Sequence, residues 1–207
     1  MRALVSLLAV LSFVAVAQAT PIVLDGGDAG TSQQGEFYYH NDSLRAYGGD
    51  DAFANANTSA ANAYYGWQVS GLNPGTYNVY TTWYTDRWLS PAWQYANNAA
   101  PFTVVAGGIV SQGWPNWNIV PAAGAATTNV TVDQSVNAAG FDYDGRSWFQ
   151  LGTVTITGDK ISVILSNFVT ASNGGPILAD AVMIDVPEPA TLSLLGLGVV
   201  GLLRRRR

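Results

Sequence analysis

Short β-type segments separated by Gly-, Asn- and Pro-rich turns run through the chain from Ile22 to Asp185. The strongest of them is Thr76–Tyr84, which follows a tight turn at residues 71–75. Large side chains at both its odd and its even positions predict a central strand that is covered on both faces. Many short strands, turns at regular intervals and no long helix predict an all-β fold, a jelly-roll-like antiparallel β-sandwich.

Further strands are predicted at residues 22–24, 35–39, 63–69, 101–105, 127–134, 147–157, 160–166 and 176–185. Gly158-Asp159, between two of these strands, is predicted as a hairpin turn. Phe141–Arg146 is predicted as a turn because it combines Gly with Asp. His40–Asn62 is predicted as a loop, since its Asn, Thr and Ser side chains compete for backbone hydrogen bonds.

The composition narrows the class of partner. The chain has no cysteine, so the domain is expected to fold without disulfides and to depend on its core. Between residues 20 and 186 there are thirteen acidic residues against Arg45, Arg87, Arg146 and Lys160, a formal net charge of −9. A surface of this sign argues against nucleic acid and anionic membranes as partners.

Residues 1–19 are predicted to be a secretory signal peptide. Arg2 precedes an apolar stretch, and Ala17 and Ala19 are small residues at the positions that a signal peptidase reads. The alternative is an uncleaved N-terminal helix, although the apolar run is short for a membrane span. The mature chain is expected to begin at Thr20.

Residues 186–207 form a tail of three parts: the corner Pro187-Glu188-Pro189, an uncharged apolar run at 190–203, and arginines at 204–207. The prolines predict an extended corner that is open to a processing enzyme. As a transmembrane helix, the apolar run would rise about 21 Å against a hydrocarbon core of about 30 Å. The arginines should stay on the cytoplasmic side of the membrane. The alternatives are an anchor that is never cut and a buried helix of the domain.

This order of corner, apolar run and arginines resembles the PEP-CTERM sorting signal of bacterial surface proteins. The resemblance implies that an exosortase, a membrane protease-transpeptidase, cuts near Pro187-Glu188-Pro189. It also implies that the protein is anchored in the inner membrane by its C-terminal end before processing. The processed chain is then passed to the cell surface or the extracellular matrix.

A second resemblance covers most of Leu24–Ile184, within the predicted β-sandwich domain at residues 20–185. Five segments, taken in order, resemble the golvesin C-terminal-like module: Asn73–Tyr80, Asn97–Val104, Thr131–Gln134, Trp148–Gly152 and Ile177–Ile184. The resemblance implies a carbohydrate-binding-like β-sandwich, of the kind found in bacterial surface proteins and beside polysaccharide-degrading enzymes. The chain departs from the simplest form in its long loops at 86–96 and 107–126, and the family supplies no set of ligand residues to carry over.

No catalytic motif is present in the sequence. There is no nucleophile elbow, no metalloprotease helix motif and no cysteine nucleophile, and His40 is the only histidine. We therefore predict that the protein is not an enzyme and that His40 is a surface residue. A pair of Asp side chains serving as glycosidase carboxyl groups remains the alternative.

Aromatic residues in polar loops suggest a carbohydrate ligand. Pyranose rings stack on Trp and Tyr, while Asp, Asn, Gln and Arg bind the sugar hydroxyls. The candidate binding residues are Trp88, Trp93, Tyr95, Trp114 and Trp117, with Asp86 and Arg87 beside them. The alternative for each Trp is that it folds back to cap the sandwich. Trp67, Trp83 and Trp148 lie within predicted strands and are assigned to the core.

Calcium is a candidate cofactor, because Asp142-Tyr143-Asp144-Gly145 and Asp25-Gly26-Gly27-Asp28 place carboxylates on turns. Neither segment has the spacing of a known calcium loop, which favours turn-forming Asp residues and no bound metal. Asp180 is flanked by apolar strand residues and needs a partner, either Arg146 or a buried backbone amide.

Two functions remain after these exclusions. The first is a non-catalytic surface or matrix protein that binds extracellular polysaccharide. The second is a structural or adhesive protein of a biofilm matrix without sugar binding. Exposed aromatic loops favour the first function, whereas an exposed hydrophobic edge strand would favour the second.

Overall fold

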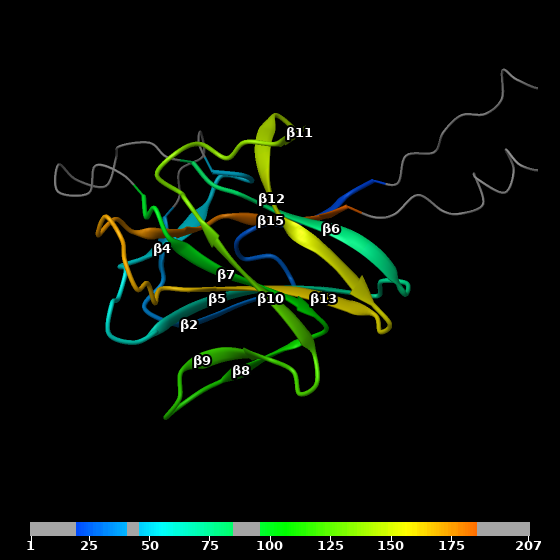
Figure 1. Ribbon diagram of the computed structural model, residues 1–207, viewed down its shortest axis with the longest axis horizontal. Helices are drawn as coiled ribbons and strands as arrows, with labels where there is room; N and C mark the ends of the chain where they lie inside the picture. Colours follow the sequence, from blue (N-terminus) through cyan, green and yellow to red (C-terminus); the bar gives the residue numbers. More distant parts are fainter. Residues whose placement is uncertain (1–19, 41–45, 85–95, 186–207) are drawn as a thin grey trace, which may run out of the picture. The chain divides into compact units, whose positions relative to one another are not determined.

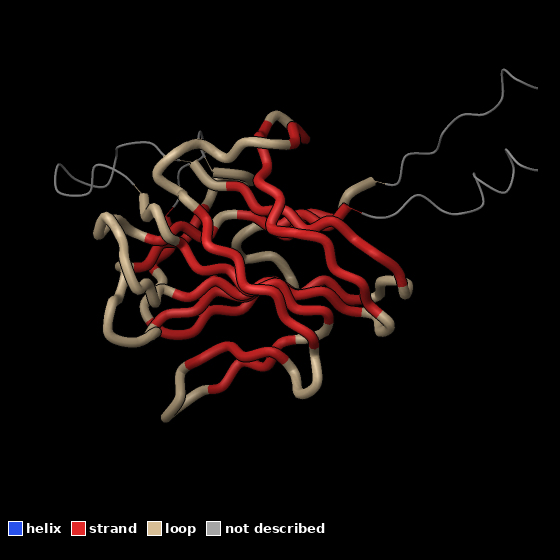
Figure 2. The backbone as a smooth tube through the Cα atoms, viewed as in Figure 1, coloured by secondary structure: helices blue, strands red, loops and turns tan. Residues whose placement is uncertain are grey.

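The computed structural model describes residues 20–40, 46–84 and 96–185, and all regular structure in these ranges is β (Figures 1 and 2). Residues 21–185 form one compact unit. Within the described ranges, no helix has the length and apolar character needed to cross a membrane. The predicted signal peptide, 1–19, and the predicted transmembrane helix, 190–203, lie outside the described residues.

Two five-stranded sheets form the main body, and every pair of neighbouring strands is antiparallel. The first sheet has the order β1 (Ile22–Leu24), β15 (Ala181–Asp185), β6 (Gly75–Thr82), β12 (Arg146–Ile156) and β11 (Phe141–Tyr143). The second sheet has the order β10 (Ala126–Val132), β7 (Ala100–Ala106), β13 (Lys160–Ser166), β5 (Ala63–Ser70) and β2 (Thr31–Gly35). The predicted antiparallel β-sandwich is confirmed.

Two smaller sheets complete the described structure. One has the order β14 (Ile177–Ala179), β4 (Asp51–Ala54) and β3 (Tyr38–His40). The other is a hairpin of β8 (Ile109–Gln112) and β9 (Asn118–Pro121), which lies beside the second sheet (Figure 1).

Strands that follow one another in the sequence often lie in opposite sheets, as in a jelly roll. The turn at Gly158-Asp159 joins β12 in the first sheet to β13 in the second. The prediction of a hairpin there is therefore wrong. A tight turn fixes only how sharply the chain reverses, whereas strand partners are chosen by burial. The turn between β5 and β6 crosses in the same way, and Leu72 N donates to Asp159 O at 3.0 Å, which ties the two crossing turns together.

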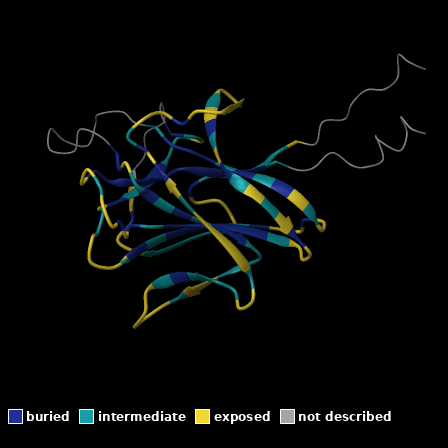
Figure 3. Cartoon of the chain, in the orientation of Figure 1, coloured by how far each residue is buried: buried dark blue, intermediate teal, exposed yellow. Residues whose placement is uncertain are grey.

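The core lies between the two main sheets (Figure 3). On β6, alternate residues Tyr77, Val79 and Thr81 are buried toward this core, whereas Asn78 and Tyr80 on the other face are only half-buried. The strand is central, as predicted, but it is not fully covered on both faces. Trp67, Trp83 and Trp148 are buried, which confirms their assignment.

Two segments predicted to lack strands contain short ones. The predicted loop 40–62 includes β4, whose small buried residues Ala52 and Ala54 pair with β14. The predicted turn 141–146 is a hairpin in which β11 pairs with β12 around Asp144-Gly145, both at positive φ. Local composition does not predict these strands, because their stability depends on packing and on partners that are distant in the sequence.

The β8–β9 hairpin packs on the outer face of the second sheet through Ile109 and Ile119, which cover Val105 and Ile164. Gly66 on β5 lies directly beneath it. A Cβ atom on Gly66 would stand 2.7 Å from Ile109 Cδ1 and 3.2 Å from Ile119 Cδ1. The hairpin therefore rests on a glycine that leaves space for two isoleucine side chains.

Gly66→Val is expected to lower the free energy of unfolding by about 1–3 kcal/mol, because the added side chain overpacks this contact. Thermal unfolding measures the change. The matched control is Gly158→Val, since a Cβ atom at that exposed turn meets nothing within 4 Å. Equal melting temperatures for the two variants would show that the hairpin does not need the space above Gly66.

Candidate functional site

Two exposed tryptophans stand on the turn of the β8–β9 hairpin. The side chain of Trp114 is 81 % exposed and that of Trp117 is 50 % exposed. Gly113 O accepts hydrogen bonds from Asn116 N at 3.0 Å and from Trp117 N at 3.2 Å, which closes the turn. Large aromatic side chains are usually buried, so a neighbouring exposed pair on a hydrogen-bonded turn is a candidate binding surface.

The other candidate binding residues, Trp88, Trp93, Tyr95, Asp86 and Arg87, lie outside the described residues. Asn97 also stood near these aromatics in the sequence, and the structure places it in the interior. Its Nδ2 donates to Ser172 Oγ at 2.8 Å and to Gly175 O at 2.9 Å, while its Oδ1 accepts from Ala99 N at 2.8 Å. Asn97 fixes the loop between residues 172 and 175 and is not accessible to a ligand.

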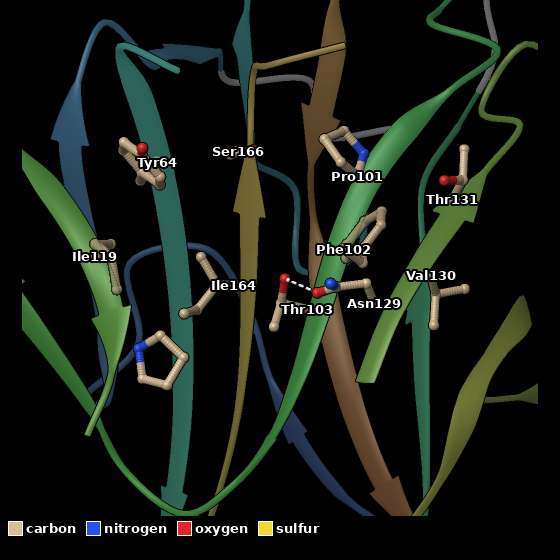
Figure 4. A pocket seen from close by; sticks show the side chains of 11 residues that line it. Tyr64, Pro101, Phe102, Thr103, Ile119, Asn129, Val130, Thr131, Ile164 and Ser166 are labelled. Carbon is tan, nitrogen blue, oxygen red and sulfur yellow. Dashed lines mark hydrogen bonds between the residues drawn. The ribbon is translucent and has the colours of Figure 1, made fainter. Parts of the chain in front are cut away.

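A groove runs beside the hairpin on the outer face of the second sheet, with a volume of about 220 Å³ (Figure 4). We call it the outer groove. Its described lining comes from the hairpin and from β5, β7, β10 and β13: Tyr64, Pro101, Phe102, Thr103, Ile119, Pro121, Asn129, Val130, Thr131, Ile164 and Ser166.

Strand register places the lining side chains in rows across the sheet. Ile164 of β13 is paired with Thr103 of β7, and Thr103 is paired with Asn129 of β10. The Thr103 hydroxyl donates to Asn129 Oδ1 at 2.9 Å, which fixes the orientation of the amide (Figure 4). In a second row Ser166 is paired with Tyr64. Residues from four distant segments thus form one surface.

A second aromatic surface lies on the outer face of the first sheet, and the sequence reading missed it. The ring centroids of Tyr80 and Phe141 are 5.6 Å apart, and those of Phe141 and Tyr143 are 6.4 Å apart. Trp148 is buried beneath them and its Nε1 donates to Tyr143 O at 3.1 Å. The alternation Phe141-Asp142-Tyr143 is the signal that could have revealed a strand here.

The acidic turns have structural roles in the described residues. Asp28 Oδ2 accepts from Asp25 N at 2.9 Å, and Asp142 Oδ1 accepts from Ser147 Oγ at 2.6 Å. Asp144 Oδ2 accepts from the Tyr47 hydroxyl at 3.0 Å. Within the described ranges, no three acidic, His or Cys side chains are grouped so that they could hold a metal ion.

Asp180 is buried between β14 and β15, and Tyr47 N donates to both carboxyl oxygens, at 3.1 Å and 3.3 Å. A backbone amide is therefore its partner, one of the two expected. Arg146 instead donates from Nη2 to Ala46 O at 2.9 Å. Burial raises the pKa of Asp180 well above its usual range, and the neighbouring Asp51 and Asp25 raise it further.

Replacing Asp180 with Ala should lower the free energy of unfolding by about 1–3 kcal/mol, because the part-buried Tyr47 N–H loses its acceptor. Asp180→Asn keeps an acceptor oxygen and adds no charge, so its stability at neutral pH should stay close to that of the parent. Denaturant unfolding of both variants distinguishes them. An unchanged midpoint for Asp180→Ala would show that the carboxyl group is not structural.

Asp25 lies in the same acidic region as Asp180, together with Asp28, Asp50 and Asp51. Burial raises its pKa to about 7, and the charges of Asp50 and Asp28 contribute in the same direction. The folded chain therefore binds a proton, between about pH 4 and pH 7, that the unfolded chain does not bind. Since the folded pKa is the higher one, stability from this group falls as the pH rises through that window.

Thermal unfolding should accordingly show a higher melting temperature at pH 5 than at pH 8. Asp25→Asn should reduce this difference, because the amide does not titrate. A melting temperature that rises from pH 5 to pH 8 in the parent, or a pH difference that Asp25→Asn leaves unchanged, would contradict this account of the acidic region.

Comparison with known proteins identifies the C-terminal tail. Residues 185–207 match the family described as the PEP-CTERM protein-sorting motif. The chain thus carries a sorting signal, as predicted. No curated protein matches the sequence.

One solved structure shares the fold of the described domain, and others are similar to it at lower scores. A Paenibacillus xanthan lyase matches with a TM-score of 0.55 and 23 % identity over 81 % of this chain. This chain spans only 13 % of that enzyme. A family 35 carbohydrate-binding module from Clostridium thermocellum matches with a TM-score of 0.48 and 14 % identity, over 80 % of this chain and 98 % of the module. The family 35 module of Cellvibrio japonicus Abf62 matches with a TM-score of 0.40 and 15 % identity, over 81 % of this chain and 95 % of the module.

Proposed function

We propose that the protein is exported, sorted to the cell surface or extracellular matrix, and binds extracellular polysaccharide without catalysing a reaction. The sorting motif at 185–207 supports the destination. The observation that carries the binding function is the exposed pair Trp114 and Trp117 on the β8–β9 hairpin. Flat indole faces in water are the side chains on which pyranose rings stack.

Processing at both ends belongs to the same proposal. A signal peptidase reads Ala17 and Ala19, and an exosortase-type protease cuts near Pro187-Glu188-Pro189. Before the second cut, the helix at 190–203 holds the chain in the inner membrane. The mass of the chain released by the producing cells tests these steps, because both cuts together leave a product of about residues 20–186.

The hairpin is suited to binding because hydrogen bonds hold its base against the second sheet and close its turn. Ile109 N donates to Gln68 Oε1 at 3.0 Å, and Ser162 Oγ donates to Gly107 O at 2.8 Å. Both bonds join the start of the hairpin segment to the second sheet. A tip fixed in this way presents its rings with little loss of conformational freedom on binding.

The second sheet gives little support to the alternative function, a matrix protein that associates through its sheet edges. The edge strand β10 carries Thr127, Thr128, Asn129 and Thr131, all exposed (Figure 3). The opposite edge, β2, carries Ser32, Gln33 and Gln34. These edges are polar and lack the apolar surface that favours edge-to-edge association.

Affinity electrophoresis of the full chain in gels that contain a soluble polysaccharide tests the proposed function. The panel includes β-1,4-glucan, mannan, galactan, alginate and polygalacturonate, each with and without calcium. Retardation by at least one polysaccharide is expected. Unretarded migration in every gel, by a chain whose unfolding is cooperative, would overturn sugar binding.

A further inference from the structure

The described lining of the outer groove contains no Asp, Glu, His, Lys or Arg side chain. Its polar groups are the hydroxyls of Tyr64, Thr103, Thr131 and Ser166 and the amide of Asn129. Hydroxyl and amide groups donate and accept hydrogen bonds without bearing a charge. They match the hydroxyl groups of a sugar, which also donate and accept.

Flat apolar surfaces alternate with these polar groups. The ring of Tyr64 and the rings of Pro101 and Pro121 line the groove, and Ile164 forms part of its floor. A pyranose has apolar C–H faces and polar edges, so it needs both kinds of surface in close proximity. The exposed side chains of Asn129 and Thr131 leave the groove accessible from the β10 side.

The groove volume of about 220 Å³ lies below the roughly 300–1,000 Å³ of sites that enclose a drug-sized ligand. The groove therefore fits a single ring of a longer chain and does not enclose a whole oligosaccharide. A polymer that crosses the groove could continue toward the hairpin, whose strand β9 supplies Ile119 and Pro121 to the lining.

Charge restricts the ligand further. In the described ranges the cationic side chains of Arg and Lys are those of Arg146 and Lys160, and neither lines the groove. Arg146 begins a strand of the first sheet, while Lys160 lies at the opposite end of β13 from Ser166. Among the described residues, nothing would supply a counter-charge to a uronate or sulfate group in the groove, and the formal net charge of the domain is −9.

We propose that the outer groove is a subsite for a neutral polysaccharide, built from hexose residues without carboxylate or sulfate groups. This inference rests on the proposed sugar-binding function and assigns the ligand class of the surface next to the hairpin. Thr103 holds the Asn129 amide so that its nitrogen can donate to a sugar hydroxyl, and Tyr64, Pro101 and Pro121 contact the C–H faces.

Affinity electrophoresis of the full chain tests the inference with three substitutions on the same sheet. Asn129→Ala should weaken retention by a neutral polysaccharide about tenfold, through the loss of hydrogen bonds to the ligand. Thr131→Arg should abolish retention by filling the groove. Thr128→Arg is the matched control, because Thr128 lies on the same exposed strand but does not line the groove.

The inference predicts retention by mannan, β-1,4-glucan or galactan, and weaker or no retention by alginate and polygalacturonate at low salt. Tighter retention by the uronate polymers would overturn the neutral ligand class while leaving sugar binding intact. Equal retention of Thr131→Arg and Thr128→Arg would overturn the groove as a subsite and leave the hairpin as the site. No retention of the parent by any polysaccharide would overturn both the inference and the proposed function.

Discussion

Replacing Gln134 with alanine should lower the free energy of unfolding by about 2–5 kcal/mol. The side chain is fully buried, and its Nε2 donates to Leu178 O at 2.7 Å. Its Oε1 accepts from Leu178 N at 2.9 Å. The amide thus pairs with the free edge of β14 in the way that a neighbouring strand would. Alanine leaves both backbone groups of Leu178 buried without partners and also leaves a cavity.

Chemical denaturation followed by tryptophan fluorescence measures this loss. The matched control is Gln150→Ala, the same substitution at an exposed position of β12, where a change within about 0.5 kcal/mol is expected. A loss below about 1 kcal/mol for Gln134→Ala would contradict the role assigned to the amide.

Removing both hairpin tryptophans should reduce polysaccharide retention about a hundredfold. Each ring contact contributes roughly 1.4 kcal/mol, a factor of about ten in affinity. Because both side chains are exposed and lie on a turn, Trp114→Ala and Trp117→Ala should leave the unfolding midpoint close to that of the parent. Affinity electrophoresis against the polysaccharide that retains the parent measures the effect.

Two further variants make this result specific to the hairpin. Tyr38→Ala removes another exposed aromatic side chain, on β3, and should retain the parental affinity. Trp114→Phe combined with Trp117→Phe keeps aromatic faces on the turn and should retain part of the affinity. If the double alanine variant binds as the parent does, the hairpin is not the platform.

Much of the fold could be predicted from the sequence because a strand is a local pattern. The segments around Tyr77, Val104 and Val163 are rich in β-branched or aromatic residues and end at turn residues. Strand partners are not local, and this is why the turn at Gly158-Asp159 was misread as a hairpin. Burial of one face against the opposite sheet selects the partner, and that selection depends on the whole chain.

The candidate site likewise has one part that the sequence predicts and one part that it does not. Exposure of Trp114 and Trp117 could be anticipated, because Gly, Pro and Asn surround them and prevent a regular strand. The outer groove could not be anticipated. It requires the register that sets Ile164, Thr103 and Asn129 side by side, and it requires Gly66 to let the hairpin settle on the sheet. Neither the strand register nor the contact at Gly66 can be predicted from the sequence around the groove residues.

Several of the segments that resemble a carbohydrate-binding-like module contain, or directly precede, a buried polar residue with a structural role. Asn97, Gln134 and Asp180 each bind backbone groups of a segment distant in the sequence. They fix the loop at Gly175, the strand β14 at Leu178 and the backbone at Tyr47. These buried side chains are therefore scaffold residues and are not accessible to a ligand.

The most direct test of the central claim is a fluorescence titration of the full chain with the soluble polysaccharides of the panel. Trp114 and Trp117 are solvent-exposed, so a stacked sugar should shift their emission to shorter wavelength in a saturable way. We expect this shift in the parent and no shift in the double alanine variant. An emission spectrum that no polysaccharide changes, from a folded parent chain, would contradict the central claim.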